Sequence, residues 1–255
     1  MNHARMIEQL DNALIAAASA PAAQSLQRFF TEPVAALGVS NAQVRRIAAA
    51  AVAAHPQLAP KDHLAVANHF AQSQRYHEHF MLASSVASSV ASSLAATAAR
   101  RTGEETCFLA WMKTWLERDA RNWAQCDDVC IKPLYLYLYL YLYLQRRSQL
   151  LDQIATWGSS EGSWCRRASC VALVKFVGRT PACDLAPILA NCERLLGDSD
   201  PYVQKGIGWI LKVAGQYEPQ RVQAFLQRHA VRMERSTLRY AIEKLAPATR
   251  RQFLA

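Results

Sequence analysis

Apolar side chains recur every three to four residues along most of the chain, which is the period of an amphipathic helix. Proline and glycine interrupt this pattern where helices are expected to end, for example at Pro60, Gly158, Gly197 and Pro219. Many short helices joined by short connections indicate helical hairpins stacked in series. The helices are predicted over residues 5–19, 41–54, 62–72, 75–99, 106–122, 146–156, 165–177, 184–196, 202–216, 219–229 and 236–245.

Two segments have low complexity. Residues 83–94 repeat Ala-Ser-Ser-Val with a period of four, which a helix accommodates with one apolar stripe. Residues 134–144 alternate Leu and Tyr, and a period of two formally predicts a strand. A single strand among helices would have no partner, and Leu is a good helix former, so we expect a helix that is apolar all round and buried. We expect its tyrosines to pack in the core; a base-stacking platform is the alternative.

Weak internal repeats support the stacked hairpins. Residues 164–168 (Trp-Cys-Arg-Arg-Ala) resemble residues 202–206 (Tyr-Val-Gln-Lys-Gly) at an offset of 38, and residues 238–240 are a third candidate copy. Paired helices with periods of about 33–47 residues are typical of helical repeat arrays, and this spacing favours HEAT-like repeats. The predicted fold class is therefore all-α, a curved array (superhelix) of HEAT-like helical hairpin repeats, in a single domain spanning residues 1–255.

Composition agrees with this fold class. The chain holds 44 Ala and only 9 Gly, which favours helices and argues against a β-sandwich, a barrel or a doubly wound α/β fold. The formal net charge is +9, and residues 201–255 contribute +7 of it, with ten Lys and Arg against three acidic residues. A basic end suits a polyanion such as nucleic acid, or an anionic membrane surface; charge that serves only solubility is the alternative.

Several classes of site and of protein are not expected. The seven cysteines form no Cys-x-x-Cys pair, and His77-Glu78-His79 lacks the spacing of a zinc-binding helix, so we expect no disulfide framework and no metal. We find neither a clean signal core nor a run of about 20 apolar residues. We therefore expect a cytoplasmic protein in a reducing compartment, without a membrane partner.

One group of residues carries candidate chemistry. Trp123 and Asp127 are four residues apart, so they share a face of a helix. Arg167 lies in the next repeat and Trp209 in the one after. If the repeats stack in register, these four residues converge on one strip of a concave groove. The alternative is that both tryptophans belong to the core and Arg167 only pairs with Asp127.

These patterns resemble those of the AlkD-like DNA glycosylases, HEAT-repeat proteins that excise alkylated purines. The resemblance runs from about residue 29 to residue 239. It implies that Asp127 is the catalytic aspartate, Trp123 and Trp209 the active-site tryptophans, and Arg167 the active-site arginine; Arg166 and Lys205 are weaker candidates for DNA contact. The motifs that carry it are Leu37-Gly38-Val39, Arg45-Arg46, Trp123-x-x-x-Asp127, Trp164-Cys-Arg-Arg167-Ala168 and Tyr202-Val-Gln-Lys-Gly-Ile-Gly-Trp209.

The resemblance implies a monofunctional enzyme that hydrolyses the N-glycosidic bond of cationic N3- or N7-alkylpurines in duplex DNA. Such a base leaves as a neutral molecule, so Asp127 alone can stabilise the oxocarbenium-like sugar and position the attacking water. Arg167 is expected to bind a phosphate, and no lysine is placed for a Schiff-base step. We expect a monomer that needs no cofactor. The alternatives are a non-catalytic HEAT-repeat protein that binds damaged or branched DNA, and a protein-binding HEAT scaffold.

Overall fold

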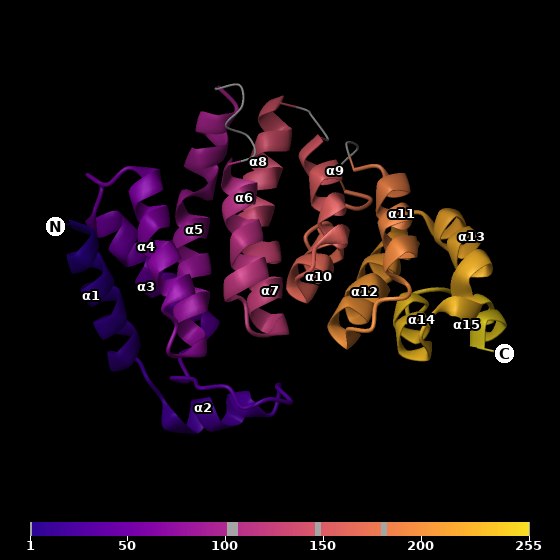
Figure 1. Cartoon of the computed structure of the whole chain (residues 1–255), viewed down its shortest axis with the longest axis horizontal. Coiled ribbons are helices and arrows are strands. Elements are labelled where there is room, and N and C mark those ends of the chain that lie inside the picture. Colours follow the sequence, from indigo (N-terminus) through magenta and orange to yellow (C-terminus); the bar gives the residue numbers. More distant parts are fainter. Residues whose placement is uncertain (1, 101–106, 146–148, 180–182, 255) are drawn as a thin grey trace. The chain divides into compact units, whose positions relative to one another are not determined.

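The computed structural model of the chain describes residues 2–100, 107–145, 149–179 and 183–254, and within these ranges it contains helices and no strand (Figure 1). This confirms the all-α prediction. The chain divides into two compact units, which we describe separately; the curved arrangement and the single domain stay predictions. Unit 1 comprises residues 1–115, 119–121 and 132–141, and unit 2 comprises residues 116–118, 122–131 and 142–255.

Unit 1 is built around α5, which packs against α3 and α4, while α1 packs against the same two helices. α1 buries Met6, Leu10 and Leu14, which recur every four residues on one face. In the centre, the rings of Phe80 and Trp115 meet edge to face at 6.0 Å between centroids. The helices of this unit are α1 (Asn2–Ala16), α2 (Ala20–Gln27), α3 (Asn41–Ala54), α4 (Pro60–Gln72), α5 (His77–Ala98), α6 (Cys107–Thr114) and most of α8 (Tyr135–Gln145).

The loop before α3 is fixed by a buried carboxylate at the start of α5. Glu78 accepts hydrogen bonds from the backbone N–H groups of Leu37, Gly38 and Val39, at 2.9, 2.7 and 3.1 Å. Gly38 has a φ of +78°, and a Cβ added there would collide with the carbonyl oxygen of Ser19. The Leu-Gly-Val motif therefore has a structural reason, because only glycine fits this turn.

The Ala-Ser-Ser-Val repeat is helical, as predicted, and forms the middle of α5. Three of its hydroxyls, those of Ser85, Ser88 and Ser89, donate to carbonyl oxygens one turn earlier, as Ser85 does to Met81 at 2.8 Å, so these three are satisfied within the helix. By length and composition α5 is apolar enough to cross a membrane, contrary to the expectation that the chain has no apolar run of this length. However, 61% of its most apolar window is buried inside the structure, as in the core helix of a globular protein.

The Leu-Tyr run also forms a helix, α8, but it is not buried all round. Tyr137 and Tyr141 are buried, whereas Tyr139 and Tyr143 are 53% and 74% exposed. A helix turns about 100° per residue, so tyrosines four apart share a face while alternate ones do not. The ring of Phe108 stacks on Tyr137 at 4.5 Å. The prediction of a helix is confirmed, and the prediction of complete burial is wrong.

Two π-helical segments stand on either side of α7 in the sequence. The predicted helix over 106–122 ends as α6 at Thr114 and continues as the π-helix η1 (Trp115–Asp119). After α7, the π-helix η2 (Cys130–Leu134) contains Pro133. Proline lacks the N–H that an α-helix would use, and the wider π-turn accommodates it.

Unit 2 is a stack of helical hairpins. α7, α10, α12 and α14 contact one another in that order, α9 contacts α11, and from α9 to α13 each helix packs against the next one in the chain. This arrangement agrees with the predicted HEAT-like hairpins. The helices are α7 (Trp123–Val129), α9 (Gln149–Thr156), α10 (Ser163–Val171), α11 (Leu185–Leu195), α12 (Pro201–Tyr217), α13 (Pro219–His229), α14 (Arg235–Ala241) and α15 (Pro247–Leu254), with 3-10 turns η3 (Trp157–Ser159) and η4 (Ala230–Arg232).

Some helix ends differ from the prediction. α10 was expected to reach residue 177 but ends at Val171, after which several amides bond three residues back, as Phe176 does to Leu173. This turn segment leads to Gly178, which has a φ of +69° and lies against the ring of Tyr217. α2 and α15 were not predicted, and the described part of each contains no buried residue that would mark an amphipathic face.

Candidate functional site

A buried ion pair joins α7 to α10. The Nε and Nη2 atoms of Arg167 donate to the two carboxylate oxygens of Asp127, both at 2.8 Å. The side chains are 6% and 12% exposed, respectively. A parallel, two-bond pair of this kind fixes the orientation of both groups. The structure therefore brings together two of the four residues that the sequence predicted to converge.

A third bond ties this pair to α12. Nη1 of Arg167 donates to the backbone carbonyl oxygen of Tyr202 at 2.6 Å. Burial acts to lower the pKa of Arg167, but the hydrogen bonds to Asp127 and its charge outweigh this effect and raise the pKa above its usual range. The guanidinium therefore stays protonated and links three helices of unit 2 through one side chain.

The start of α7 is set by a local cap. The side chain of Asn122 accepts a hydrogen bond from the N–H of Gln125 at 3.1 Å, and Trp123 is the first residue of the helix. Asp127 follows one turn later, where the sulfur of its neighbour Cys126 lies 3.3 Å from the carbonyl oxygen of Trp164 in α10. This contact and the ion pair hold one face of α7 against α10.

The two predicted tryptophans are both half-buried. Trp123 lies four residues before Asp127 on the same face of α7, as predicted. Trp209 lies on α12, three residues after Gly206 and on the same side of that helix. A Cβ on Gly206 would lie 3.4 Å from Cγ of Arg167, so this side of α12 faces the ion pair. Trp209 is thus placed about one turn from the helix surface that Arg167 touches.

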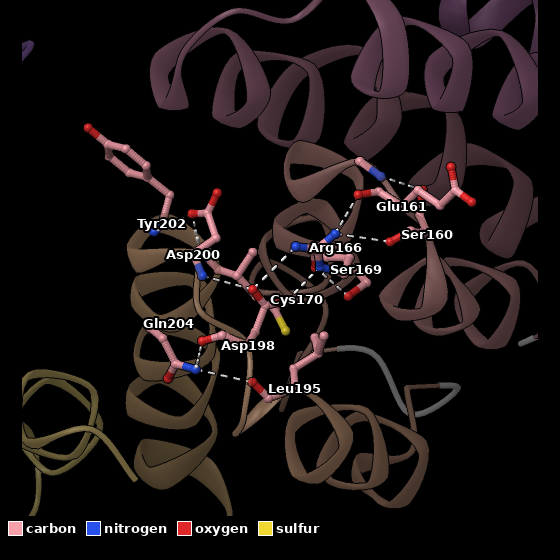
Figure 2. A network of polar contacts seen from close by, with 12 residues as sticks. Ser160, Glu161, Arg166, Ser169, Cys170, Leu195, Asp198, Asp200, Tyr202 and Gln204 are labelled. Atoms are coloured by element: carbon pink, nitrogen blue, oxygen red, sulfur yellow. Dashed lines mark hydrogen bonds and ion pairs between the residues drawn. The ribbon is translucent and has the colours of Figure 1, made fainter. Parts of the chain in front are cut away.

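Arg166 points into a different set of polar contacts, centred on Asp198 (Figure 2). Its Nε and Nη2 atoms bond to the carboxylate of Asp198 at 2.5 and 3.3 Å. Its Nη1 atom bonds to the carbonyl oxygens of Ser160 and Glu161 at 3.1 and 2.6 Å. The hydrogen bonds to Asp198 outweigh desolvation and raise the pKa of Arg166. This side chain holds the turn before α10 to the turn before α12, and its contact with DNA stays a prediction.

Lys205 is exposed on α12, and its ammonium group lies over the ring of Tyr202, 5.1 Å from the ring centroid. The same ring meets that of Trp164 at 5.2 Å between centroids and 46° between planes. In the sequence, Trp164 and Tyr202 stand out only as markers of the repeat. The signal that reveals them is that repeat itself, since the offset of 38 residues places an aromatic ring in the first turn of each helix.

All seven cysteines lie in the described part of the chain, and none of them forms a disulfide bond. Cys126 and Cys130 flank Asp127 in sequence; burial, together with a hydrogen bond to Cys126, raises the pKa of Cys130 well above its usual range. This thiol is therefore kept protonated beside the ion pair. Among the described residues, no group of three or more His, Cys, Asp or Glu side chains is placed to hold a metal ion.

The hairpin stack and the ion pair across its helices define the chain as a helical-repeat protein with a buried ion pair in unit 2. Residues 10–245 match the model of a family described as DNA alkylation repair enzyme, and the chain belongs to that family. A solved structure described as a predicted DNA alkylation repair enzyme from Enterococcus faecalis has a similar fold. Its TM-score is 0.73, it is 13% identical, and the match covers 90% of this chain and 97% of that one. No curated protein matches the chain in sequence.

Proposed function

We propose that this protein is a monofunctional DNA glycosylase that hydrolyses the N-glycosidic bond of cationic N3- or N7-alkylpurines in duplex DNA. The observation that carries the proposal is the single carboxylate of Asp127, held in a fixed orientation by Arg167 in a member of a DNA alkylation repair family. The basic C-terminal part of the chain supports a polyanionic substrate.

The chemistry needs little more than one carboxylate. An alkylated purine carries a positive charge, so the base takes the bonding electrons and leaves as a neutral molecule without a proton donor. Positive charge then develops on the deoxyribose. A preoriented carboxylate stabilises this charge and accepts a proton from the water that attacks the anomeric carbon. We assign this role to Asp127.

Arg167 has two roles in this proposal: it orients the carboxylate of Asp127, and it binds a DNA phosphate. A guanidinium has five N–H groups, and the contacts to Asp127 and Tyr202 use three of them. One N–H on each terminal nitrogen remains for a phosphate oxygen. In this proposal Arg167 fixes Asp127 and adds a phosphate contact when DNA binds, while Trp123 and Trp209 pack against the sugar and exclude water.

The test is single-turnover base release from a methylated duplex, with Asp127→Asn as the variant and Asp128→Asn as the matched control. Asp128 is the adjacent buried carboxylate on α7. Asp127→Asn is expected to lower the rate by about 10²–10³-fold, because an amide neither balances the sugar charge nor accepts the proton. The control variant is expected to release base. Far-UV circular dichroism checks that both variants are folded.

One observation favours a second candidate function, a non-catalytic protein that binds damaged or branched DNA. Both oxygens of Asp127 accept from Arg167, and the side chain is only 12% exposed, as in a purely structural pair. If the wild-type protein binds methylated duplex but releases no base, this second function replaces the first. If the Asp127→Asn protein releases base at the wild-type rate, the catalytic carboxylate is not Asp127.

A further inference from the structure

An aromatic side chain occupies the first turn of three helices that contact in series. Trp123 begins α7, Trp164 is the second residue of α10, and Tyr202 is the second residue of α12. α10 contacts both of the other helices. The rings of Trp164 and Tyr202 touch, with 5.2 Å between their centroids.

Neither ring of this touching pair is part of the buried core. Trp164 and Tyr202 are both half-buried, unlike the fully buried aromatic residues of the unit such as Phe225. In Figure 2 the ring of Tyr202 points away from the polar network around Arg166, although its backbone lies beside that network. A pair of accessible rings held in fixed positions is typical of a surface that takes a flat or apolar part of a ligand.

A cation stands next to the rings. Lys205 is exposed and lies one turn after Tyr202, with its ammonium group 5.1 Å from the ring centroid. Within the described part of the chain, no carboxylate pairs with this lysine. The charge is therefore free to meet an anion immediately beside an aromatic surface, and an ammonium group binds phosphate as a point charge.

We propose that Trp164, Tyr202 and Lys205 form a subsite for the sugar–phosphate backbone of one DNA strand, with deoxyribose against the rings and a phosphate at Lys205. Charge complementarity supports this occupant, because residues 201–255 carry +7. The identity of the ligand rests on the proposed function, but the subsite requires no catalysis.

The subsite is connected to the ion pair through the backbone of one residue. The carbonyl oxygen of Tyr202 accepts the 2.6 Å bond from Arg167, which in turn holds Asp127. A strand seated on the ring of Tyr202 is thus placed relative to the carboxylate by a single residue. In this reading the subsite positions the strand, and Asp127 acts on the sugar that follows.

The experiment measures binding of an unmethylated duplex by fluorescence anisotropy across a salt titration. Tyr202→Ala is expected to weaken binding by roughly 10-fold, and Tyr202→Phe, which keeps the ring, is expected to restore most of the affinity. Lys205→Gln is expected to reduce the slope of log affinity against log salt by about 1, as for one lost phosphate contact. Lys244→Gln is the matched control, because Lys244 is exposed and already faces Glu243 at 3.7 Å.

The outcomes separate this proposal from the proposed function. Binding that depends on Tyr202 and Lys205 in a protein that releases no base supports the subsite and overturns the glycosylase. Base release by a protein in which Tyr202→Ala and Lys205→Gln bind like the wild type overturns the subsite and leaves the glycosylase standing. A wild-type protein that binds no duplex overturns both.

Discussion

Breaking the ion pair between Asp127 and Arg167 is expected to cost far more stability than its two hydrogen bonds suggest. Both side chains are almost completely buried, so removing one partner leaves an uncompensated charge inside unit 2. Losses of this kind are about 3–5 kcal/mol in the free energy of unfolding. Arg167→Met is expected at the upper end, because the carboxylate of Asp127 accepts from no other donor among the described residues.

Asp127→Asn is expected at the lower end of that range. Arg167 then keeps its bond to the carbonyl oxygen of Tyr202, and the amide oxygen of the new side chain still accepts one bond. The double variant Asp127→Asn/Arg167→Met removes both charges and leaves no buried ion without a partner. It is therefore expected to be more stable than the sum of the single losses predicts, with a coupling of about 2–3 kcal/mol.

The assay is urea unfolding of the four proteins at pH 7.5, followed by tryptophan fluorescence and circular dichroism. Arg221→Met is the matched control, because it removes ion pairs at the surface. Arg221, Glu218 and Asp184, which form these pairs, have side chains that are about one third exposed or more. Its loss is expected to be about 0–1 kcal/mol. The reasoning is refuted if either single variant loses less unfolding free energy than the Arg221→Met control. It is also refuted if the loss in the double variant equals the sum of the two single losses.

Three further predictions concern the scaffold. Glu78→Gln is expected to lower the free energy of unfolding by about 1.5–3 kcal/mol, because its amide group replaces one of the two acceptor oxygens and faces at least one of the three backbone donors; urea unfolding measures this loss, and an unchanged stability would contradict it. Gly208→Ala is expected to lower the free energy of unfolding by about 1–3 kcal/mol, since a Cβ at this position would lie 2.9 Å from Cδ1 of Tyr240. Gly206→Ala is the comparison, because the nearest atom to a Cβ there is 3.4 Å away; equal stability of the two variants would contradict the expected clash. Burial lowers the pKa of His79 below its usual 6.5 despite its bond to Asp11. The contribution of this neutral histidine to stability is therefore complete above about pH 6.5 and decreases as the pH falls below that value. Urea midpoints that stay constant or rise from pH 7.5 to pH 5.5 would contradict this direction.

The sequence was enough to predict the fold class, but not which face of each helix is buried. The abundance of Ala and the scarcity of Gly favour helices wherever the chain packs, so the all-α prediction followed from composition. In the run of residues 134–144, the alternation of Leu and Tyr carried no helical period. Only tertiary packing decides that Tyr137 is buried and Tyr139 exposed, because both faces are equally apolar.

The sequence predicted which residues belong to the candidate site, but not which hydrogen bonds they form. The spacing of Trp123 and Asp127, and the position of Arg167 in the next repeat, predicted that the polar pair lies on adjacent repeats. Whether the arginine would face phosphate or carboxylate depended on distances of a few ångströms between helices, which no periodicity encodes. The same applies to Tyr202, because the atom that matters to Arg167 is a backbone oxygen, and every residue has one.

The two adjacent arginines explain how one repeat builds both the site and its support. Consecutive residues on a helix point about 100° apart, so Arg166 and Arg167 reach different neighbours from the same turn of α10. Arg166 binds Asp198, whose carboxylate accepts from the N–H of Asp200, and the carboxylate of Asp200 accepts from the N–H of Tyr202 at 2.7 Å (Figure 2). The backbone carbonyl oxygen of Tyr202 in turn accepts a hydrogen bond from Arg167. The polar network is therefore continuous with the ion pair, and the turn of residues 198–200 sets the position from which Arg167 holds its carboxylate.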